Sequence, residues 1–164
     1  DELALFCREW PTEFPLAVEV RHPSFFASGN DEADLNDYLR SRGYDRVIFD
    51  SRALYHKSPD DEVEAASQTR KPNLPVRWIH SSQSPFLRLV GRNKIELTDP
   101  WLEEAADAAA QWIQKGMKPF LFMHAPDDQF APYLCERFYQ RLSQRIQLPP
   151  LDLSLARGDQ MELF

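Results

Sequence analysis

The chain has 164 residues, enough to bury the core of one domain. Its hydrophobic content of 43% and aromatic content of 12% are typical of a globular protein and exclude an intrinsically disordered one. The net charge of −7 argues against bulk electrostatic binding of nucleic acid, although it leaves room for a local basic site. No apolar run reaches the length of a membrane span. The two cysteines, Cys7 and Cys135, favour a reduced, cytoplasmic compartment.

The chain opens on a segment, DELALFCREWP, that predicts a helix ending before Pro11. A strand follows directly, and a helix that leads straight into a strand is the middle of a β/α series. The chain also begins at Asp1 rather than at Met. We therefore expect it to be the C-terminal part of a longer protein.

Strands and helices are then predicted in alternation along the chain. Strands are predicted over residues 16–22, 46–52, 86–92 and 119–124. Helices are predicted over about 31–42, from Asp99 to a stop at Gly116, and from near Pro132. The connection over residues 51–85 is long, with a short helix expected over 60–69, and its length suggests a functional loop or lid.

This alternation predicts an α/β fold with a parallel sheet, resembling a TIM barrel and amounting to the C-terminal half of a (β/α)8 barrel. A small doubly wound sheet is the alternative. We assign residues 1–148 to one partial β/α barrel domain and residues 149–164 to a C-terminal tail. The sequence contains neither G-x-G-x-x-G nor a P-loop, so the nucleotide sites that depend on these motifs are not predicted.

Each of the four predicted strands ends in charged or imidazole side chains, where parallel α/β folds build their ligand sites. The candidates for acid/base catalysis are Glu19, Asp50 and His124. The candidates for binding a substrate or an anion are Arg21, His22, Arg52, Arg88, Arg92 and Asp127. Each group also has a structural explanation, because buried ion pairs can brace a barrel and an aspartate can cap a strand or helix end. In particular, Arg88 can pair with Glu19 or with Asp50.

A metal site is a further candidate in the loop after the last strand. There His124, with Asp127 or Asp128, offers ligands for a divalent metal or a route for proton transfer. The sequence has no close pair of histidines such as H-x-x-x-H, so the cofactor remains unknown.

The last five residues, QMELF, resemble the bacterial sliding-clamp-binding pentapeptide, Gln-x-x-Leu-Phe. Leu163 and Phe164 would be the apolar anchors and Gln160 would add hydrogen bonds. The alternative is that Leu163 and Phe164 pack against their own domain.

Four motifs, PLAVEVRHPSFF, RKPNLPV, FLRLVGR and PFLFMHAPDDQFAP, occur in order within residues 14–145. Together they resemble the YecE-like family, domain-of-unknown-function family 72. The resemblance implies a (β/α)8 barrel of about twice this length. It brings no established reaction with it. It points to these residues as lining the barrel mouth: Glu19, Arg21, His22, Asp50, Arg52, Arg88, Arg92, His124 and Asp127. The family is also distantly similar to endonuclease-IV-like and sugar-isomerase-like barrels.

Three functions follow as hypotheses. The first is a barrel with a phosphate-binding site, acting on a phosphate-containing ligand or DNA in the manner of a phosphodiesterase or nuclease, and brought to DNA repair or replication by the sliding clamp. The second is a small-molecule isomerase, lyase or hydrolase that uses the same residues. The third is a non-catalytic ligand-binding module, in which the charged residues only recognise a ligand or brace the barrel.

Overall fold

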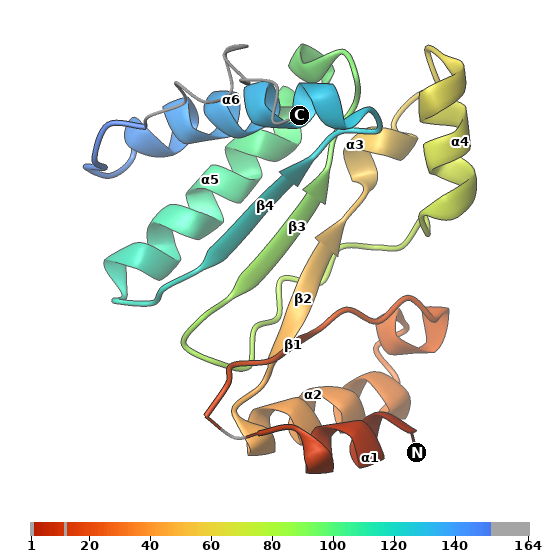
Figure 1. The fold of residues 1–164 in the computed structure, drawn as a ribbon, viewed down its shortest axis with the longest axis vertical. Helices are drawn as coiled ribbons and strands as arrows, with labels where there is room; N and C mark the ends of the chain where they lie inside the picture. The colour runs from red at the N-terminus through yellow and green to blue at the C-terminus, as the bar shows by residue number, and fades with distance from the viewer. Residues whose placement is uncertain (1, 12, 152–164) are drawn as a thin grey trace, which may run out of the picture.

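The computed structural model describes residues 2–11 and 13–151. Four strands form one sheet in the order β1-β2-β3-β4, and every neighbouring pair is parallel. The strands are β1 (Ala17–Val18), β2 (Asp45–Asp50), β3 (Phe86–Val90) and β4 (Phe120–His124). The predicted parallel α/β architecture is confirmed (Figure 1).

The predicted helices are all found, and one more, α3 (Arg52–Tyr55), begins where the strand predicted over residues 46–52 is expected to end. They are α1 (Glu2–Glu9), α2 (Asn30–Arg42), α3 (Arg52–Tyr55), α4 (Glu62–Arg70), α5 (Asp99–Gln114) and α6 (Ala131–Ser143). Short 3-10 turns stand at Pro23–Phe26, Ile95–Thr98 and Asp128–Phe130. Within the described residues, no helix is both long and apolar enough to cross a membrane.

The first strand is much shorter than predicted. The sequence favours a strand over residues 16–22, yet only Ala17 and Val18 pair with β2. Beyond them the chain leaves the sheet edge for the first 3-10 turn, where the His22 side chain accepts a hydrogen bond from the Ser24 backbone N–H. Alternation still governs the segment, because Val18 packs in the apolar cluster beneath α2 while Glu19 reaches β3.

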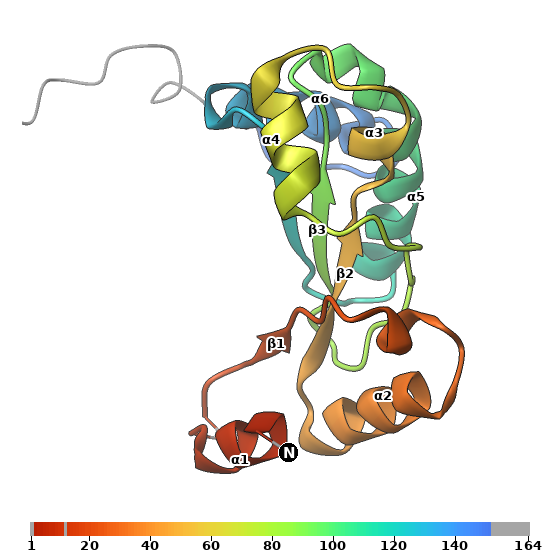
Figure 2. The same ribbon diagram turned by 90° about the vertical axis from the view of Figure 1, so that its right-hand side faces the viewer.

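The two faces of the sheet differ in what covers them. Helices α5 and α6 cover one face, and the core lies there. Its buried residues include Ile48, Leu87, Leu89 and Met123 from the strands and Ala105, Ala109, Trp112, Phe138 and Leu142 from the helices. The alternate strand residues point to the opposite face, which we call the α4 face because α4 stands on that side of β3 (Figure 2). It carries Phe86, Arg88, Phe120, Phe122 and His124.

Helices α5 and α6 are joined by a ladder of ion pairs that follows the helical repeat. The carboxylates stand four residues apart on α5, and the arginines stand four apart on α6 and in the turn directly after it, where Arg145 lies. Their pairs are Arg137–Asp99, Arg141–Asp99, Arg141–Glu103, Arg145–Glu103 and Arg145–Asp107. The ladder fixes the two helices against each other along the rim of the core.

The connection between β2 and β3 first builds α3 and α4 and then returns as an extended segment on the α5 side. Arg77 in this segment lies 3.1 Å from the Glu32 carboxylate of α2. Trp78 Nε1 donates a hydrogen bond of 2.8 Å to Glu104 of α5. The segment therefore fills the space between α2 and α5, and α4 is free to lie on the other side of the sheet (Figure 2).

A buried ion pair anchors α4 to the end of β3. Arg92 and Glu64 are 1% and 0% exposed, and Arg92 Nε donates to Glu64 Oε1 at 3.3 Å. The same carboxylate accepts the backbone N–H groups of Asp60 and Asn93, each at 2.9 Å. Asp61 caps the helix by accepting the Glu64 N–H, and the Asn93 amide group lowers the pKa of Asp61 by donating to it.

The Arg92 side chain should therefore matter for stability. We expect Arg92→Met to lower the free energy of unfolding by about 3–5 kcal/mol, because it leaves the Glu64 carboxylate buried without a counter-charge. Replacing Glu64 by glutamine in the same variant should recover part of that loss, because glutamine is neutral and its amide oxygen can still accept the N–H groups of Asp60 and Asn93. Arg40→Met, which removes an exposed pair with Asp37, should cost less than about 1 kcal/mol. Urea unfolding monitored by circular dichroism measures all three; a small effect of Arg92→Met alone would contradict the prediction.

Candidate anion-binding site

The carboxyl ends of the strands meet α4 on the α4 face, and the last turn of α4 is fixed there by α3. The Tyr55 hydroxyl lies in hydrogen-bond range of the backbone oxygens of Gln68 and Lys71. Gln68 Nε2 donates a hydrogen bond of 2.8 Å to the Leu54 backbone oxygen. Burial raises the pKa of Tyr55, so this hydroxyl stays a proton donor at neutral pH. These hydrogen bonds fix the end of α4, and with it Arg70 and Lys71, beside the carboxyl ends of the strands.

Three charged side chains from β3 and from the segment after β1 meet beside this place. Glu19 Oε2 is 2.8 Å from Arg88 Nη1, and Glu19 Oε1 is 2.7 Å from Arg21 Nη2. Burial opposes ionisation of Glu19, but the hydrogen bonds from Arg88 and Arg21 outweigh it, so the pKa of Glu19 lies below its usual value. Glu19 thus holds two guanidinium groups on the α4 face as an ionised carboxylate.

Lys71 and His124 complete the site and are both shifted toward their neutral forms. Burial is the main cause of the lowered pKa of Lys71, and the charges of Arg70, Arg88 and Arg21 add to it. Burial also lowers the pKa of His124, with Lys71, Arg88 and Arg70 acting in the same direction. Asp128, whose carboxylate lies 3.4 Å from His124 Nδ1, opposes both shifts.

We call this group the cationic cluster. It consists of Arg21, Arg70, Lys71, Arg88 and His124, with Glu19 and Asp128 as its carboxylates. With His124 neutral, four cations face two carboxylates, so the cluster carries an excess of two positive charges within a chain whose net charge is −7. Lowered pKa values in neighbouring basic groups are expected where an anion would supply the missing counter-charge.

The predicted pair Asp50 and Arg52 lies on the other side of the sheet. In the register of β2 and β3, Phe49 stands beside Arg88 and Asp50 stands beside Leu89, which faces the core under α5. Asp50 is 1% exposed and binds Arg52, and Arg52 also reaches Glu104 of α5. Hydrogen bonding to Asp50 raises the pKa of Arg52. The structure therefore does not bring these two residues to the cationic cluster.

Three other predicted site residues have structural partners. Arg92 is buried in the anchor of α4. His22 caps the first 3-10 turn, with its ring edge toward Phe25. Asp127 caps the 3-10 turn at Asp128–Phe130 by accepting the Gln129 N–H at 3.1 Å. Of the residues proposed from the sequence, Glu19, Arg21, Arg88 and His124 are the ones that meet.

Sequence reasoning missed Arg70 and Lys71 as site residues. They lie at the end of the short helix in the long connection between β2 and β3, and nothing in the sequence relates the end of that helix to the strand ends. The signal available was RKPNLPV, one of the motifs that carry the family resemblance.

Two further sequence predictions find no site among the described residues. Within residues 2–11 and 13–151, no group of three or more His, Cys, Asp or Glu side chains is placed to hold a metal ion. The clamp-binding candidates Gln160, Leu163 and Phe164 lie outside the described residues.

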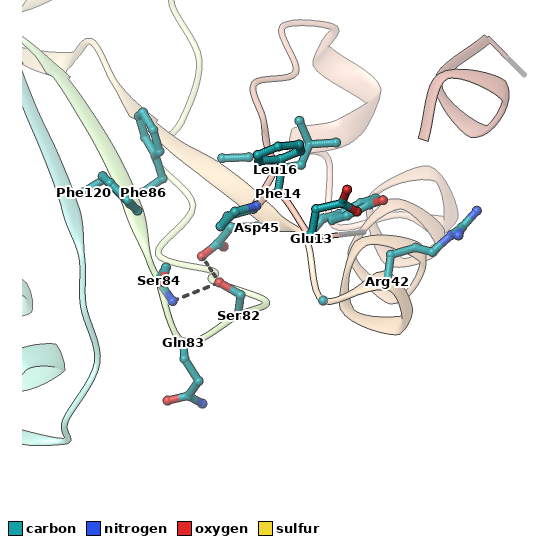
Figure 3. Close-up of a pocket in the computed structure, with 14 residues that line it drawn as sticks. Glu13, Phe14, Leu16, Arg42, Asp45, Ser82, Gln83, Ser84, Phe86 and Phe120 are labelled. Atoms are coloured by element: carbon teal, nitrogen blue, oxygen red, sulfur yellow. Dashed lines mark hydrogen bonds between the residues drawn. The ribbon is translucent and has the colours of Figure 1, made fainter. Parts of the chain in front are cut away.

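A cleft of about 450 Å³ lies at the opposite, amino ends of the strands (Figure 3). Its walls include Phe14, Phe86 and Phe120, and its buried carboxylate, Asp45, already binds Ser82 Oγ at 2.8 Å and the Ser81 N–H. Because its buried acid is satisfied and the cationic cluster lies at the other end of the strands, we place the candidate site at the carboxyl ends.

Comparison with known proteins connects this chain to one family. The chain is 37% identical over 163 residues to the UPF0759 protein YecE of Escherichia coli strain K12, and equally so to that of strain O157:H7. The match covers 97% of this chain but only 57% of each relative. The chain is also similar in fold to the crystal structure of a DUF72 family protein (EF0366) from Enterococcus faecalis V583. That likeness has a TM-score of 0.60 at 14% identity, covering 90% of this chain and 55% of the other.

The family model described as "Protein of unknown function DUF72" matches residues 1–156. It therefore spans nearly all of the chain, including every residue of the cationic cluster. The chain belongs to the DUF72 family.

Proposed function

We propose that the cationic cluster recognises a phosphate-bearing ligand. The observation that carries the proposal is the gathering of Arg21, Arg70, Lys71, Arg88 and His124 on one face of an otherwise acidic chain. Burial and mutual repulsion disfavour the charged forms of Lys71 and His124, and a bound anion would reverse both effects. Guanidinium groups match the oxygens of phosphate with paired hydrogen bonds, which makes Arg88 and Arg21 the main contacts.

The same site supports chemistry as well as binding. In a hydrolase or phosphodiesterase, neutral His124 would accept a proton from water and Arg88 would balance the charge that develops on phosphate oxygens. Glu19 would then be a positioning residue, because both of its oxygens already hold guanidinium groups. A small-molecule isomerase or lyase would use His124 in the same role, whereas a binding module would need only the basic side chains.

The first test is binding of inorganic phosphate. Arg88→Gln should weaken phosphate binding by about tenfold or more, because a charge-assisted hydrogen bond to the anion is lost. Arg88→Lys should lose less, since it keeps the charge without the planar fork. Isothermal titration calorimetry on the folded variants measures both.

Arg40→Gln is the matched control for loss of one positive charge. Arg40 lies on the exposed side of α2 and pairs with Asp37 of the same helix. Phosphate affinity should be unchanged in this variant. Equal losses in Arg88→Gln and Arg40→Gln would show that any binding is bulk electrostatics, and the cluster would then not be an anion site.

Anion binding should also depend on pH through His124. Its pKa is lowered in the free protein and should rise when an anion binds, so binding takes up a proton and affinity increases as pH falls. Sulfate is the suitable probe because it stays a dianion between about pH 5 and 8, where histidine titrates. Calorimetry in buffers of different ionisation enthalpy counts the protons. His124→Gln should remove the uptake in the pH range where histidine titrates; uptake that persists there would assign it to another group, of which Lys71 is the first candidate.

A second proposal concerns the partner rather than the ligand. The terminal sequence QMELF has the spacing of a sliding-clamp-binding pentapeptide, with two adjacent apolar anchors and a polar residue three positions before them. Recruitment by the bacterial clamp would place the phosphate-recognising site near DNA, in replication or repair. The alternative for this segment is packing against its own domain.

Binding to the purified bacterial sliding clamp tests this second proposal. The full chain should bind, and replacing Leu163 and Phe164 together by alanine should abolish binding, because the apolar anchors supply most of such contacts. Surface plasmon resonance with the clamp immobilised gives the affinities. Glu162→Ala is the control, since the motif leaves that position free. Failure of the unaltered chain to bind would assign QMELF to packing.

A further inference from the structure

The outer layer of the fold lacks a helix over the middle of the sheet. In a regular (β/α)8 barrel the helix after each strand packs on the outside. Here the main helix after β2, α4, lies on the other face, and residues 72–81 fill the outer position between α2 and α5 as an extended segment (Figure 2). Because β2 and β3 each have two neighbours already, any further strand can join the sheet only beside β1 or β4, away from this position.

The extended segment pairs with no strand. Between Asn73 and His80, no backbone group forms a hydrogen bond to the backbone of another described residue. Most of these residues are partly exposed. Extended chain with unpaired N–H and C=O groups at the surface is what a second polypeptide uses when it adds a strand. The outer position is therefore suited to a polypeptide partner.

A cleft of about 340 Å³ opens between this segment and α5. Its flat walls are the rings of Trp78, His80 and Trp112. The centroids of Trp78 and Trp112 are 6.1 Å apart, and the His80 ring stands edge-on to Trp112 at the same distance. The hydrogen bond from Trp78 Nε1 to Glu104 holds the Trp78 indole in place. The cleft thus presents fixed aromatic rings at the surface.

The rim of the cleft is acidic. Glu104 and Asp107 line it with side chains that are 44% and 62% exposed, and none of the described residues that line it is a lysine or an arginine. Glu104 shares Arg52 with the buried Asp50, so these three side chains carry one negative charge in excess. His80 Nδ1 faces a backbone oxygen at 3.2 Å and must donate to it, which leaves Nε2 of the neutral ring as a further acceptor. The cleft therefore suits a monocation that donates hydrogen bonds.

We propose that this cleft binds an arginine side chain of a partner polypeptide, whose backbone runs along residues 73–80. A guanidinium group is a planar monocation that stacks on aromatic rings and donates in a fork to carboxylates, here on Trp78 and to Glu104 and Asp107. Asp107 meets Arg145 through Oδ1, which leaves Oδ2 to the partner. A lysine side chain would supply the charge without the flat group and the fork.

Binding of short peptides to the full chain tests the proposal, with isothermal titration calorimetry as the measurement. The probe is acetyl-Ala-Ala-Arg-Ala-Ala-amide. The same peptide with citrulline, which is neutral and has the shape of arginine, should bind about tenfold more weakly, because the charge-assisted hydrogen bonds are lost. The lysine peptide should lie between the two. Butylguanidinium, which has no peptide backbone, should bind more weakly than the arginine peptide.

Two variants test the cleft itself. Trp78→Leu should weaken binding of the arginine peptide by about three- to tenfold, because it removes the stacked ring. Asp107→Asn should weaken it by about threefold, because it removes one exposed carboxylate. Asp37→Asn is the matched control, since Asp37 is an exposed carboxylate of α2 that pairs with Arg40, and it should leave the affinity unchanged. Circular dichroism establishes that each variant is folded, and the exposed position of Asp107 keeps the test open if Trp78→Leu does not fold.

The outcomes separate the parts of the proposal. If the citrulline peptide binds as tightly as the arginine peptide, or if both variants bind normally, the arginine assignment is wrong. Equal affinities for butylguanidinium and the arginine peptide would make the cleft a small-molecule site and overturn the polypeptide partner. Failure of every probe to bind overturns both. None of these results bears on the phosphate site, which uses the other face of the sheet.

Discussion

The buried ion pair between Arg92 and Glu64 is the constraint on which the strand-end architecture depends. Two charges without water are stable only when their remaining hydrogen-bonding groups are satisfied. Glu64 meets this condition by accepting backbone N–H groups from Asp60 and Asn93 as well as the guanidinium group. Asn93 extends the link by accepting the Asp127 N–H at 2.8 Å. One carboxylate therefore connects α4 with the loops that follow β2, β3 and β4.

The position of α4 decides the electrostatics of the site. Because its first turn is anchored at Arg92 and its end is fixed by Tyr55, Arg70 and Lys71 lie close to Arg88 and His124. Bringing like charges together in a half-buried place raises the free energy of the empty site. An anion bound at this place would relieve the repulsion, which is why the proposed ligand is an anion.

Part of the site follows from the sequence because strands alternate. Glu19 and Arg21 share one side of their segment and pair with each other, and Glu19 also pairs with Arg88, as one of the alternatives for Arg88 foresaw. The same rule could not place Asp50 and Arg52, because alternation relates residues within a strand and does not tell which side of one strand matches which side of its neighbour. The observed register sets Phe49, not Asp50, beside Arg88. Asp50 and Arg52 consequently face α5.

The sequence by itself determined the helices and strands and their parallel arrangement. Apolar strands, amphipathic helices and helix stops each depend on residues that are close together in the chain. Only the tertiary structure decided which charges meet. Arg92 and Glu64 are 28 residues apart, and Arg88 and Glu19 are 69 apart. Neither the helix nor the strand repeat relates residues that are so far apart in the sequence. Arg92 meets Glu64 because the long connection after β2 crosses to the α4 face before it returns along α5, and Arg88 meets Glu19 because the segment after β1 and β3 lie on the same face of the sheet.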